Sequence, residues 1–431
     1  NRDDTNSPKD CEFGGYRRAR ISSQCIKRAI RRQFGQDGLL SGEELAHRSK
    51  RLVEEVARRL AESGKDLETA KKLVTAALAG VSLKVGDDGK TQYLLFMGEN
   101  EIAGLVQVVQ KHWDALEAAV NAAKPEDPEN AAAKKKSAKQ QKAAAKGTVP
   151  EEVREAVDKL LDGGKACDLA LFGRMLADLP ERNIDAACQV AHAISTNKVS
   201  VEMDYYTAVD DLKPEDTAGA DMIGTVEFNS ACFYRYANID LDQLIDPRNL
   251  QGDEALARKT VEAFLRASVA AIPTGKQNSM AAHNPPSFVL AVVRDTGLWS
   301  LANAFVQPVQ PRGNDDLVKL SIQRLDNHWG KLAKGFGDGA VKARPAFVLD
   351  EVGTDVKDRG CLSALKDQQV GTIDQLVEEL EAIRRDVLAV DQFVVVGHSA
   401  GGALAQRYAL KYREHVAGMV LVSSIPINNG V

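Results

Sequence analysis

The chain has 431 residues and a formal net charge of −5 at pH 7, and 44% of its side chains are apolar, 27% charged and 5% aromatic. This length allows two or three domains with a substantial core, and 33 glycines with 14 prolines exclude a fibrous or wholly disordered chain. No apolar run approaches the ~18–20 residues that span a bilayer, and no basic and apolar leader opens the sequence. We therefore expect neither a membrane partner nor secretion.

The six cysteines lie at least 14 residues apart, with Cys11 and Cys25 the closest pair. This spacing excludes the CxxC motifs of zinc and redox sites, so we predict no metal site and no cofactor. The cysteine usage suits the reducing cytoplasm. The net acidity argues against a surface covered by nucleic acid, although it leaves room for a local basic groove.

The first 34 residues are strongly basic, with nine Lys and Arg residues against four Asp and Glu residues. A Gly14–Gly15 turn precedes the basic segment 16–21. A helix is predicted next, because Ile26, Ile30 and Phe34 recur at every fourth position.

The start of this helix is a candidate anion site. Ser22 or Ser23 can cap it, which leaves N–H groups at the helix start beside Lys27 and Arg31. Helix N-termini with nearby cations bind phosphate readily. A solvated basic helix is the alternative interpretation.

From Gly42 to about Val120 the apolar spacing is helical, and a further helix is predicted near Pro150. Residues 121–148 are a low-complexity Ala/Lys stretch with seven lysines and three acids. Because this composition cannot supply a core, a mobile linker is favoured over a loosely helical insertion that touches RNA.

Residues 198–237 predict a long β-hairpin, since apolar and polar side chains alternate on both of its arms. The connection 210–224 carries five acids against Lys213, a net charge of −4. We expect this tip to suit a basic protein surface rather than phosphate.

The rest of the central region mixes helices and strands. A helix is expected at 254–271, a polar loop at 275–279, a strand at 288–293 and a helix at 314–335. Together with the hairpin, these elements predict an α+β fold rather than a doubly wound sheet.

Several motifs follow one another along about residues 1–340. They are Asn1–Asp4, Phe13–Gln24, Ala191–Thr196, Thr207–Leu212, Phe233–Ile239, Gly275–Gln277, Asn284–Pro285 and Ala302–Phe305. Together they closely resemble the backbone subunit of the type I-E CRISPR Cascade complex, the CasC family. The resemblance implies a non-catalytic subunit whose copies polymerise along one guide RNA. Its implied partners are the guide RNA, target DNA through the guide, copies of itself, other Cascade subunits and a separate nuclease-helicase, in antiviral defence.

The resemblance implies a modified RRM-like (ferredoxin-like) palm, a helical fingers insertion and a β-hairpin thumb. The expected parts are the palm at 1–40 and 160–345, the fingers at 41–159 with the linker 121–148, the thumb at 198–237, an extension at 346–390 and a separate C-terminal segment at 391–431. The family also has a strand before the position of Asn1. Without that strand we expect the palm sheet to have an open edge.

The resemblance also implies which residues contact the guide RNA. They are Lys9, Arg17, Arg18, Arg20, Ser22, Gln24, Lys27, Arg31, Met175, Tyr206, Thr207, Ile223 and Lys276. Met175 and Ile223 match apolar side chains that wedge beside the displaced base, although the sequence alone favours core packing for both. Tyr206 and Thr207 match the base of the thumb. His192, a conceivable catalytic base, lies in an apolar run read as helical, and a structural role is preferred.

The C-terminal segment carries a different motif. An apolar strand at 392–396 runs into Gly397-His398-Ser399-Ala400-Gly401, and a helix and a second strand are predicted after it. This strand–GxSxG–helix–strand order is typical of the nucleophile elbow of α/β-hydrolases, and it resembles a proline-iminopeptidase-type hydrolase. A capping box at 372–375 starts a helix that fits either part, so the join stays open.

A serine hydrolase fused to an RNA-binding scaffold is the alternative function, and a tail that docks a partner is a third. The hydrolase triad needs an acid and then a His after the Ser. Only 32 residues follow Ser399, and they hold Glu414 and His415 side by side. We therefore predict no catalytic residue, and a fusion, a misjoined reading frame or an adventitious tail explains the segment better.

Overall fold

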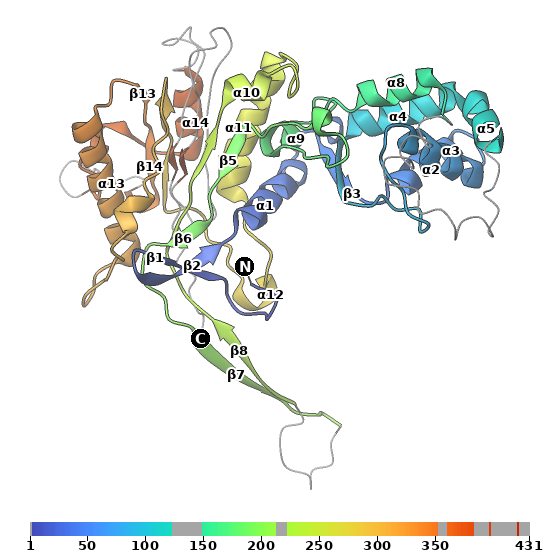
Figure 1. Ribbon diagram of the computed structural model, residues 1–431. Coiled ribbons are helices and arrows are strands. Elements are labelled where there is room, and N and C mark those ends of the chain that lie inside the picture. The colour runs from blue at the N-terminus through green and yellow to red at the C-terminus, as the bar shows by residue number, and fades with distance from the viewer. Residues whose placement is uncertain are drawn as a thin grey trace. The chain divides into compact units, whose positions relative to one another are not determined.

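The computed structural model (Figure 1) describes residues 2–122, 149–212, 222–351 and 360–382 and the short pairs 396–397 and 420–421. Three features predicted from the sequence lie mainly outside these residues. They are the Ala/Lys-rich linker, the acidic tip of the hairpin and the segment around Ser399.

The chain divides into two compact units. Unit 1 comprises residues 1–39, 188–242 and 257–431, and unit 2 comprises residues 40–187 and 243–256. This division differs from the predicted parts, because 160–187 and 243–256, both expected within the palm, group with unit 2. Each unit is described by itself.

Unit 1 contains a small antiparallel sheet with the strand order β1-β2-β6-β9. Its strands are β1 (Asp10–Phe13), β2 (Tyr16–Ile21), β6 (Ala193–Ser195) and β9 (Phe233–Tyr234). The predicted Gly14–Gly15 turn joins β1 to β2, and both glycines have positive φ angles, 63° and 79°. Helix α1 (Ser23–Gln36) follows β2 and buries Ile26, Ile30 and Phe34, as their spacing predicts.

The other elements around unit 1 are short strands and helices. They are β5 (Cys188–Val190), β10 (Ala237–Ile239), α10 (Leu241–Ile245), α11 (Glu254–Ala270), α12 (Gln277–Met280), β11 (Phe288–Leu290), β12 (Val293–Arg294), η3 (Ala302–Phe305), α13 (Leu317–Phe336), β13 (Val341–Ala343), β14 (Ala346–Val348), β15 (Gln369–Val370) and α14 (Ile373–Ala382). The helices predicted at 254–271 and 314–335 correspond to α11 and α13. The single strand predicted at 288–293 is two strands, because β11 pairs with β14 whereas β12 pairs with β13.

The core of unit 1 lies between these strands and α13. Phe288, Phe305, Leu325 and Trp329 are fully or almost fully buried and belong to one apolar cluster. At the start of α14, the predicted capping box is present. The Thr372 hydroxyl accepts the N–H of Gln375 (3.0 Å), and the Gln375 side chain accepts the N–H of Thr372 (3.1 Å).

The predicted hairpin is formed by β7 (Glu202–Ala208) and β8 (Met222–Phe228), which pair in antiparallel register from Glu202–Phe228 to Ala208–Met222. Figure 1 shows it as a ribbon that extends away from the rest of its unit. Every residue of β7 is exposed. The predicted hairpin thus forms, and its alternating pattern does not correspond to a buried and an exposed face of β7.

Unit 2 is mainly helical, as the spacing from Gly42 onward predicts. Its elements are η1 (Gly42–Glu44), β3 (Ala46–Ser49), α2 (Leu52–Glu62), α3 (Leu67–Gly80), β4 (Leu95–Gly98), α4 (Glu99–Lys111), α5 (Trp113–Ala122), α8 (Glu151–Leu160), α9 (Cys167–Phe172) and η2 (Pro180–Arg182). One large apolar cluster from the helices forms its core. The pairing of β3 with β4 was not predicted from the sequence.

In the C-terminal segment the two described pairs of residues, β16 (Val396–Gly397) and β17 (Val420–Leu421), are parallel to each other. Ser399 lies outside the described residues. Within the described part of the chain, no helix combines the length and the apolar character needed to cross a membrane.

Candidate nucleic-acid interface

The start of α1 differs from the expected serine cap. Ser22 occupies the N-cap position, but its side chain makes no capping bond. The N–H of Ser23 instead donates to His192 Nδ1 at 3.0 Å. Burial, followed by the nearby cations Arg20 and Lys9, lowers the pKa of His192, which keeps the ring neutral, so that Nδ1 can accept this hydrogen bond.

His192 lies between β5 and β6, so the helix expected around it is absent. Its contact with α1 gives it the structural role that the sequence analysis preferred. One N–H group at the start of α1 is therefore already occupied. The remaining anion-binding capacity of this region depends more on side-chain cations than on the helix end.

The position of Arg18 speaks against the RNA contact that the resemblance implies for it. Its side chain is 0% exposed. The guanidinium donates to the carbonyl oxygens of Ser195 (2.9 Å) and Thr196 (3.1 Å) on one side and of Phe305 (2.6 Å) and Val306 (3.1 Å) on the other. A phosphate outside the protein cannot reach these N–H groups.

A pocket of unit 1 brings together three of the expected RNA-binding residues, Lys9, Arg20 and Lys276. Arg2, which the sequence analysis counted but did not single out, also lines it. The pocket also has apolar lining residues, among them Phe228 at the end of β8. Because these four cations line it, this pocket is called the basic pocket below.

Asn229 follows the last residue of β8 and lines the basic pocket as well. Its Nδ2 atom is buried and has no hydrogen-bond partner among the described residues. A buried amide donor without a partner costs about 1–3 kcal/mol, so a ligand in the pocket would relieve it. The sequence analysis did not identify Asn229 as a site residue, because its place in the alternating pattern made it an ordinary polar position of the hairpin.

Two other expected residues of this region differ in their surroundings. Arg17 is exposed and forms an ion pair with Asp10. Ser22 is buried. Along α1, Gln24, Lys27 and Arg31 follow at intervals of three and four residues and so share one face.

Met175 and Ile223 are 81% and 61% exposed. Core packing, which the sequence alone favoured for both, is therefore wrong. Ile223 lies opposite Thr207 in the β7–β8 hairpin, and Tyr206 lies opposite Gly224. Tyr206, Thr207 and Ile223 thus lie together, but beside the Ala208–Met222 end of the hairpin, so the expected position of Tyr206 and Thr207 at the base of the thumb is wrong. Met175 belongs to unit 2.

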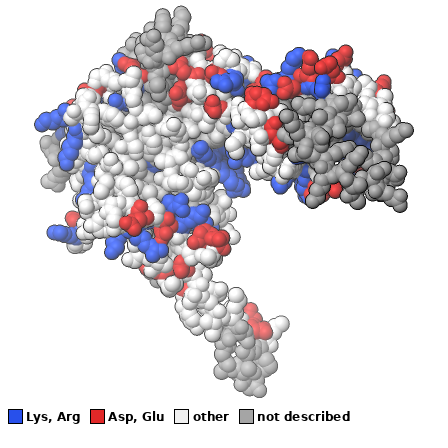
Figure 2. Space-filling model, in the orientation of Figure 1, with Lys and Arg blue, Asp and Glu red and all other residues white. Residues whose placement is uncertain are grey.

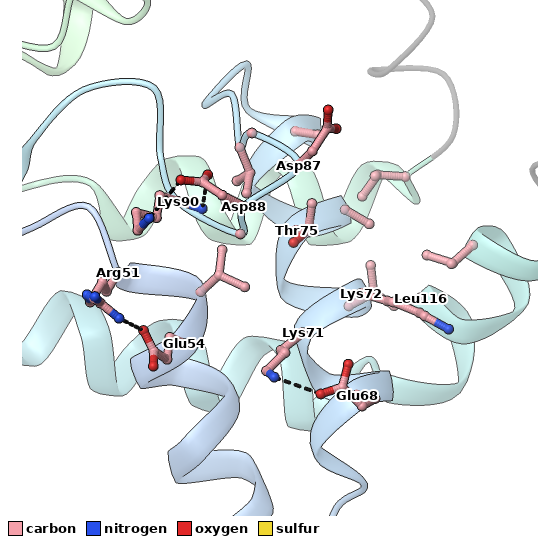
Figure 3. Close-up of a pocket in the computed structure, with 18 of the residues that line it drawn as sticks. Arg51, Glu54, Glu68, Lys71, Lys72, Thr75, Asp87, Asp88, Lys90 and Leu116 are labelled. Atoms are coloured by element: carbon pink, nitrogen blue, oxygen red, sulfur yellow. Dashed lines mark hydrogen bonds and ion pairs between the residues drawn. The ribbon is translucent and has the colours of Figure 1, made fainter.

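A pocket of unit 2, of about 900 Å³, has a different character (Figure 3). Its lining holds four cations and four acids. Six of these side chains form the ion pairs Arg51–Glu54, Lys71–Glu68 and Lys90–Asp88. It offers no comparable excess of cations. No group of His, Cys, Asp and Glu side chains that could hold a metal ion occurs among the described residues.

The C-terminal part of the sequence matches hydrolases. Residues 352–430 match the model of the alpha/beta hydrolase fold, which begins upstream of the boundary expected at 391. The proline iminopeptidase of Saccharolobus solfataricus is 47% identical over 64 residues, 14% of this chain and 21% of that protein. That of Thermoplasma volcanium is 42% identical over 59 residues, 13% of this chain and 20% of that protein. The chain thus spans about a fifth of the length of these curated relatives.

A much longer match begins at the first residue. A chain of a CRISPR RNA-guided surveillance complex, described as pre-nicking, superposes with a TM-score of 0.69 and 31% identity, covering 89% of this chain and 95% of that chain. Another surveillance-complex chain superposes with a TM-score of 0.59 and 27% identity, covering 88% and 95%. Residues 1–379 match the family model of CT1975-like proteins, Cas_CT1975. The chain therefore belongs to the CT1975-like protein family.

Proposed function

We propose that this protein is a non-catalytic backbone subunit of a CRISPR Cascade surveillance complex, in which it binds the guide RNA and polymerises along it. The observation that carries the proposal is the likeness, over nearly the whole length of both chains, to a subunit of an RNA-guided complex. Its partners are the guide RNA, target DNA through the guide, copies of itself, other Cascade subunits and a separate nuclease-helicase. The complex acts in antiviral defence in the cytoplasm.

The basic pocket is the proposed centre of guide binding. Arg2, Lys9, Arg20 and Lys276 supply positive charge on one surface, and phosphate contacts of this kind fix a strand in place without reading its sequence. Lys27 and Arg31 add positive charge along α1, and Gln24 adds an amide that can hydrogen-bond to the RNA. The buried amide of Asn229 supports a ligand with hydrogen-bond acceptors.

In this proposal the sheet β1-β2-β6-β9 with α1 belongs to an RRM-like palm, unit 2 forms the fingers, and the β7–β8 hairpin is the thumb. Met175 and Ile223 are the apolar wedges beside the displaced nucleotide. Their exposure supports this role, because an apolar side chain of this size normally packs in the interior. Neither side chain prefers a particular base, which suits a subunit that must hold any guide.

The hydrolase function is the weaker alternative. The match to proline iminopeptidases is real but covers only 13–14% of this chain. The match also covers only about a fifth of those relatives, so most of the hydrolase fold lies outside it.

The nucleic acid that co-purifies with the full chain tests the proposed function. We expect an absorbance ratio typical of a ribonucleoprotein and RNA of uniform length. Lys9→Glu and Lys276→Glu should each lower the RNA content, whereas Lys84→Glu, the same charge change at an exposed site of unit 2, should not. A chain that purifies free of RNA and does not assemble on an added guide would contradict the proposal.

A further inference from the structure

Unit 1 has a second groove, of about 680 Å³, between α13 and the segment that follows η3. Arg324, His328 and Lys331 line it from α13, and Gln307 and Gln310 line it from the other side. None of its lining residues belongs to the basic pocket. It is called the α13 groove below, and guide binding as proposed above does not use it.

The solvent face of α13 is positively charged because the only acidic residue of this helix is buried. Asp326 is 1% exposed, and its carboxylate accepts the N–H groups of Ser363 (2.8 Å), Ala364 (3.0 Å) and Leu365 (2.9 Å). The lysines and the arginine of the helix are therefore not neutralised along it. In Figure 2, Lys and Arg side chains gather at the left edge, where Figure 1 shows α13.

The groove itself holds two positive charges and one negative charge. Arg324 donates one N–H to the Gln307 carbonyl (2.7 Å) and keeps its other donors. Asp315 lines the groove as well, and its carboxylate accepts the N–H of Arg312 (3.1 Å). Burial, followed by Lys331, lowers the pKa of His328, so this ring contributes hydrogen bonds rather than charge at neutral pH.

The other polar side chains of the groove are amides, from Asn303, Gln307, Gln310, Gln323 and Asn327. Amides donate and accept hydrogen bonds without a net charge. At the end of α13, outside the groove, Phe336 is 80% exposed, and an exposed ring offers a surface on which a base can stack.

The geometry fits an extended strand. Arg324, His328 and Lys331 span seven residues of helix, a rise of about 10.5 Å, which matches a track of a few phosphates. A stable protein partner would instead need a larger apolar centre. Val306, at 36% exposed, is the groove's largest exposed apolar side chain in the described part of the chain.

We infer that the α13 groove binds the phosphate backbone of single-stranded DNA, namely the strand displaced when the guide pairs with its target. The inference rests on the proposed function, because only a guide-loaded complex opens a DNA duplex. It adds a second nucleic-acid site to a subunit that already holds the guide in the basic pocket.

The test measures the binding of labelled oligothymidine, which does not pair with the guide, to the full chain assembled on guide RNA. Lys331→Glu should weaken this binding about three- to tenfold and reduce the log–log salt slope by at least ~0.7. Lys319→Glu is the matched control, because Lys319 lies on the same helix but outside the groove. Lys331→Arg, which keeps the charge, should retain the affinity.

Equal losses in Lys331→Glu and Lys319→Glu would overturn the inference, since they would indicate a general charge effect. Unchanged DNA binding with loss of another subunit from Lys331→Glu complexes would assign the groove to a protein instead. Guide content separates this inference from the proposed function. If all variants carry as much RNA as the parent chain and Lys331→Glu binds oligothymidine as tightly as the parent, the assignment of the groove is wrong but the proposed function stands.

Discussion

Replacement of Arg18 by Ala should destabilise unit 1 rather than remove a guide contact. The buried guanidinium joins the carbonyls of Ser195 and Thr196 to those of Phe305 and Val306. Each of these carbonyls loses a donor in the variant. The resulting change in the free energy of unfolding follows from how many of them have another donor.

The Thr196 carbonyl keeps a donor, because the N–H of Val309 also binds it (2.9 Å). The other three lose the donation from Arg18. The bonds to Ser195 and Phe305 are buried, whereas the bond to Val306 is only partly buried. At about 1 kcal/mol for each buried acceptor, the loss is about 2 kcal/mol, and the cavity left by the side chain adds to it. Since single domains are stable by about 5–15 kcal/mol, this is a large fraction of the total.

Arg17→Ala is the matched control one residue away. Arg17 forms an exposed ion pair with Asp10, and such pairs contribute about 0–1 kcal/mol. Urea unfolding followed by tryptophan fluorescence can separate the units, because Trp299 and Trp329 lie in unit 1 and Trp113 in unit 2. The reasoning is refuted if Arg18→Ala unfolds like the parent but loses RNA as strongly as Lys9→Glu.

Three further predictions concern guide binding and the tail. Lys9→Glu should weaken all guide sequences about equally and lower the salt slope by at least ~0.7; a loss confined to one sequence would argue against backbone contacts. Removal of the acidic tip, residues 212–222, should disturb regular polymerisation more than the binding of one subunit to a short RNA, and unchanged spacing in electron micrographs would reject this. Ser399→Ala should change neither guide binding nor ester turnover; labelling of Ser399 by a fluorophosphonate probe would show that a base activates it.

The local sequence predicts elements well where one face is buried. Ile26, Ile30 and Phe34 recur at helical spacing, and the structure buries all three on α1. The Thr372 capping box also forms as predicted, because its two hydrogen bonds involve neighbours in the sequence. Such features depend on contacts within a few residues, so the sequence alone is sufficient for them.

The candidate site depends on contacts between distant residues, and there the sequence is insufficient. Arg17, Arg18 and Arg20 look alike in a basic run. Only the pairing of β2 with β6 and the position of η3 bury Arg18 while Arg20 reaches the pocket. Asn229 likewise lines the basic pocket only because segments far along the chain, such as Lys9 and Lys276, form the rest of it. His192 caps a helix that begins 169 residues earlier, a relation that no local pattern reports.

The strand β2 lies between the two proposed nucleic-acid sites, and this gives a way to disturb one without the other. Ala19 and Arg20 line the basic pocket, whereas Arg18 holds the carbonyl of Val306, whose residue lines the α13 groove. A Cβ added at Gly14 would overlap that same carbonyl oxygen. Gly14→Ala must therefore shift the groove wall, because backbone cannot move aside as a side chain can.

Gly15→Ala provides the control for this change. Gly15 has the same kind of strained backbone, with φ of 79°, but nothing lies within 4 Å of an added Cβ. Both variants should lose about 1 kcal/mol or more of stability from the positive φ angle. Only Gly14→Ala should also weaken oligothymidine binding to the guide-loaded complex, while its guide content stays at the level of Gly15→Ala. Equal DNA affinities of the two variants would mean that the Val306 segment is not part of the DNA site.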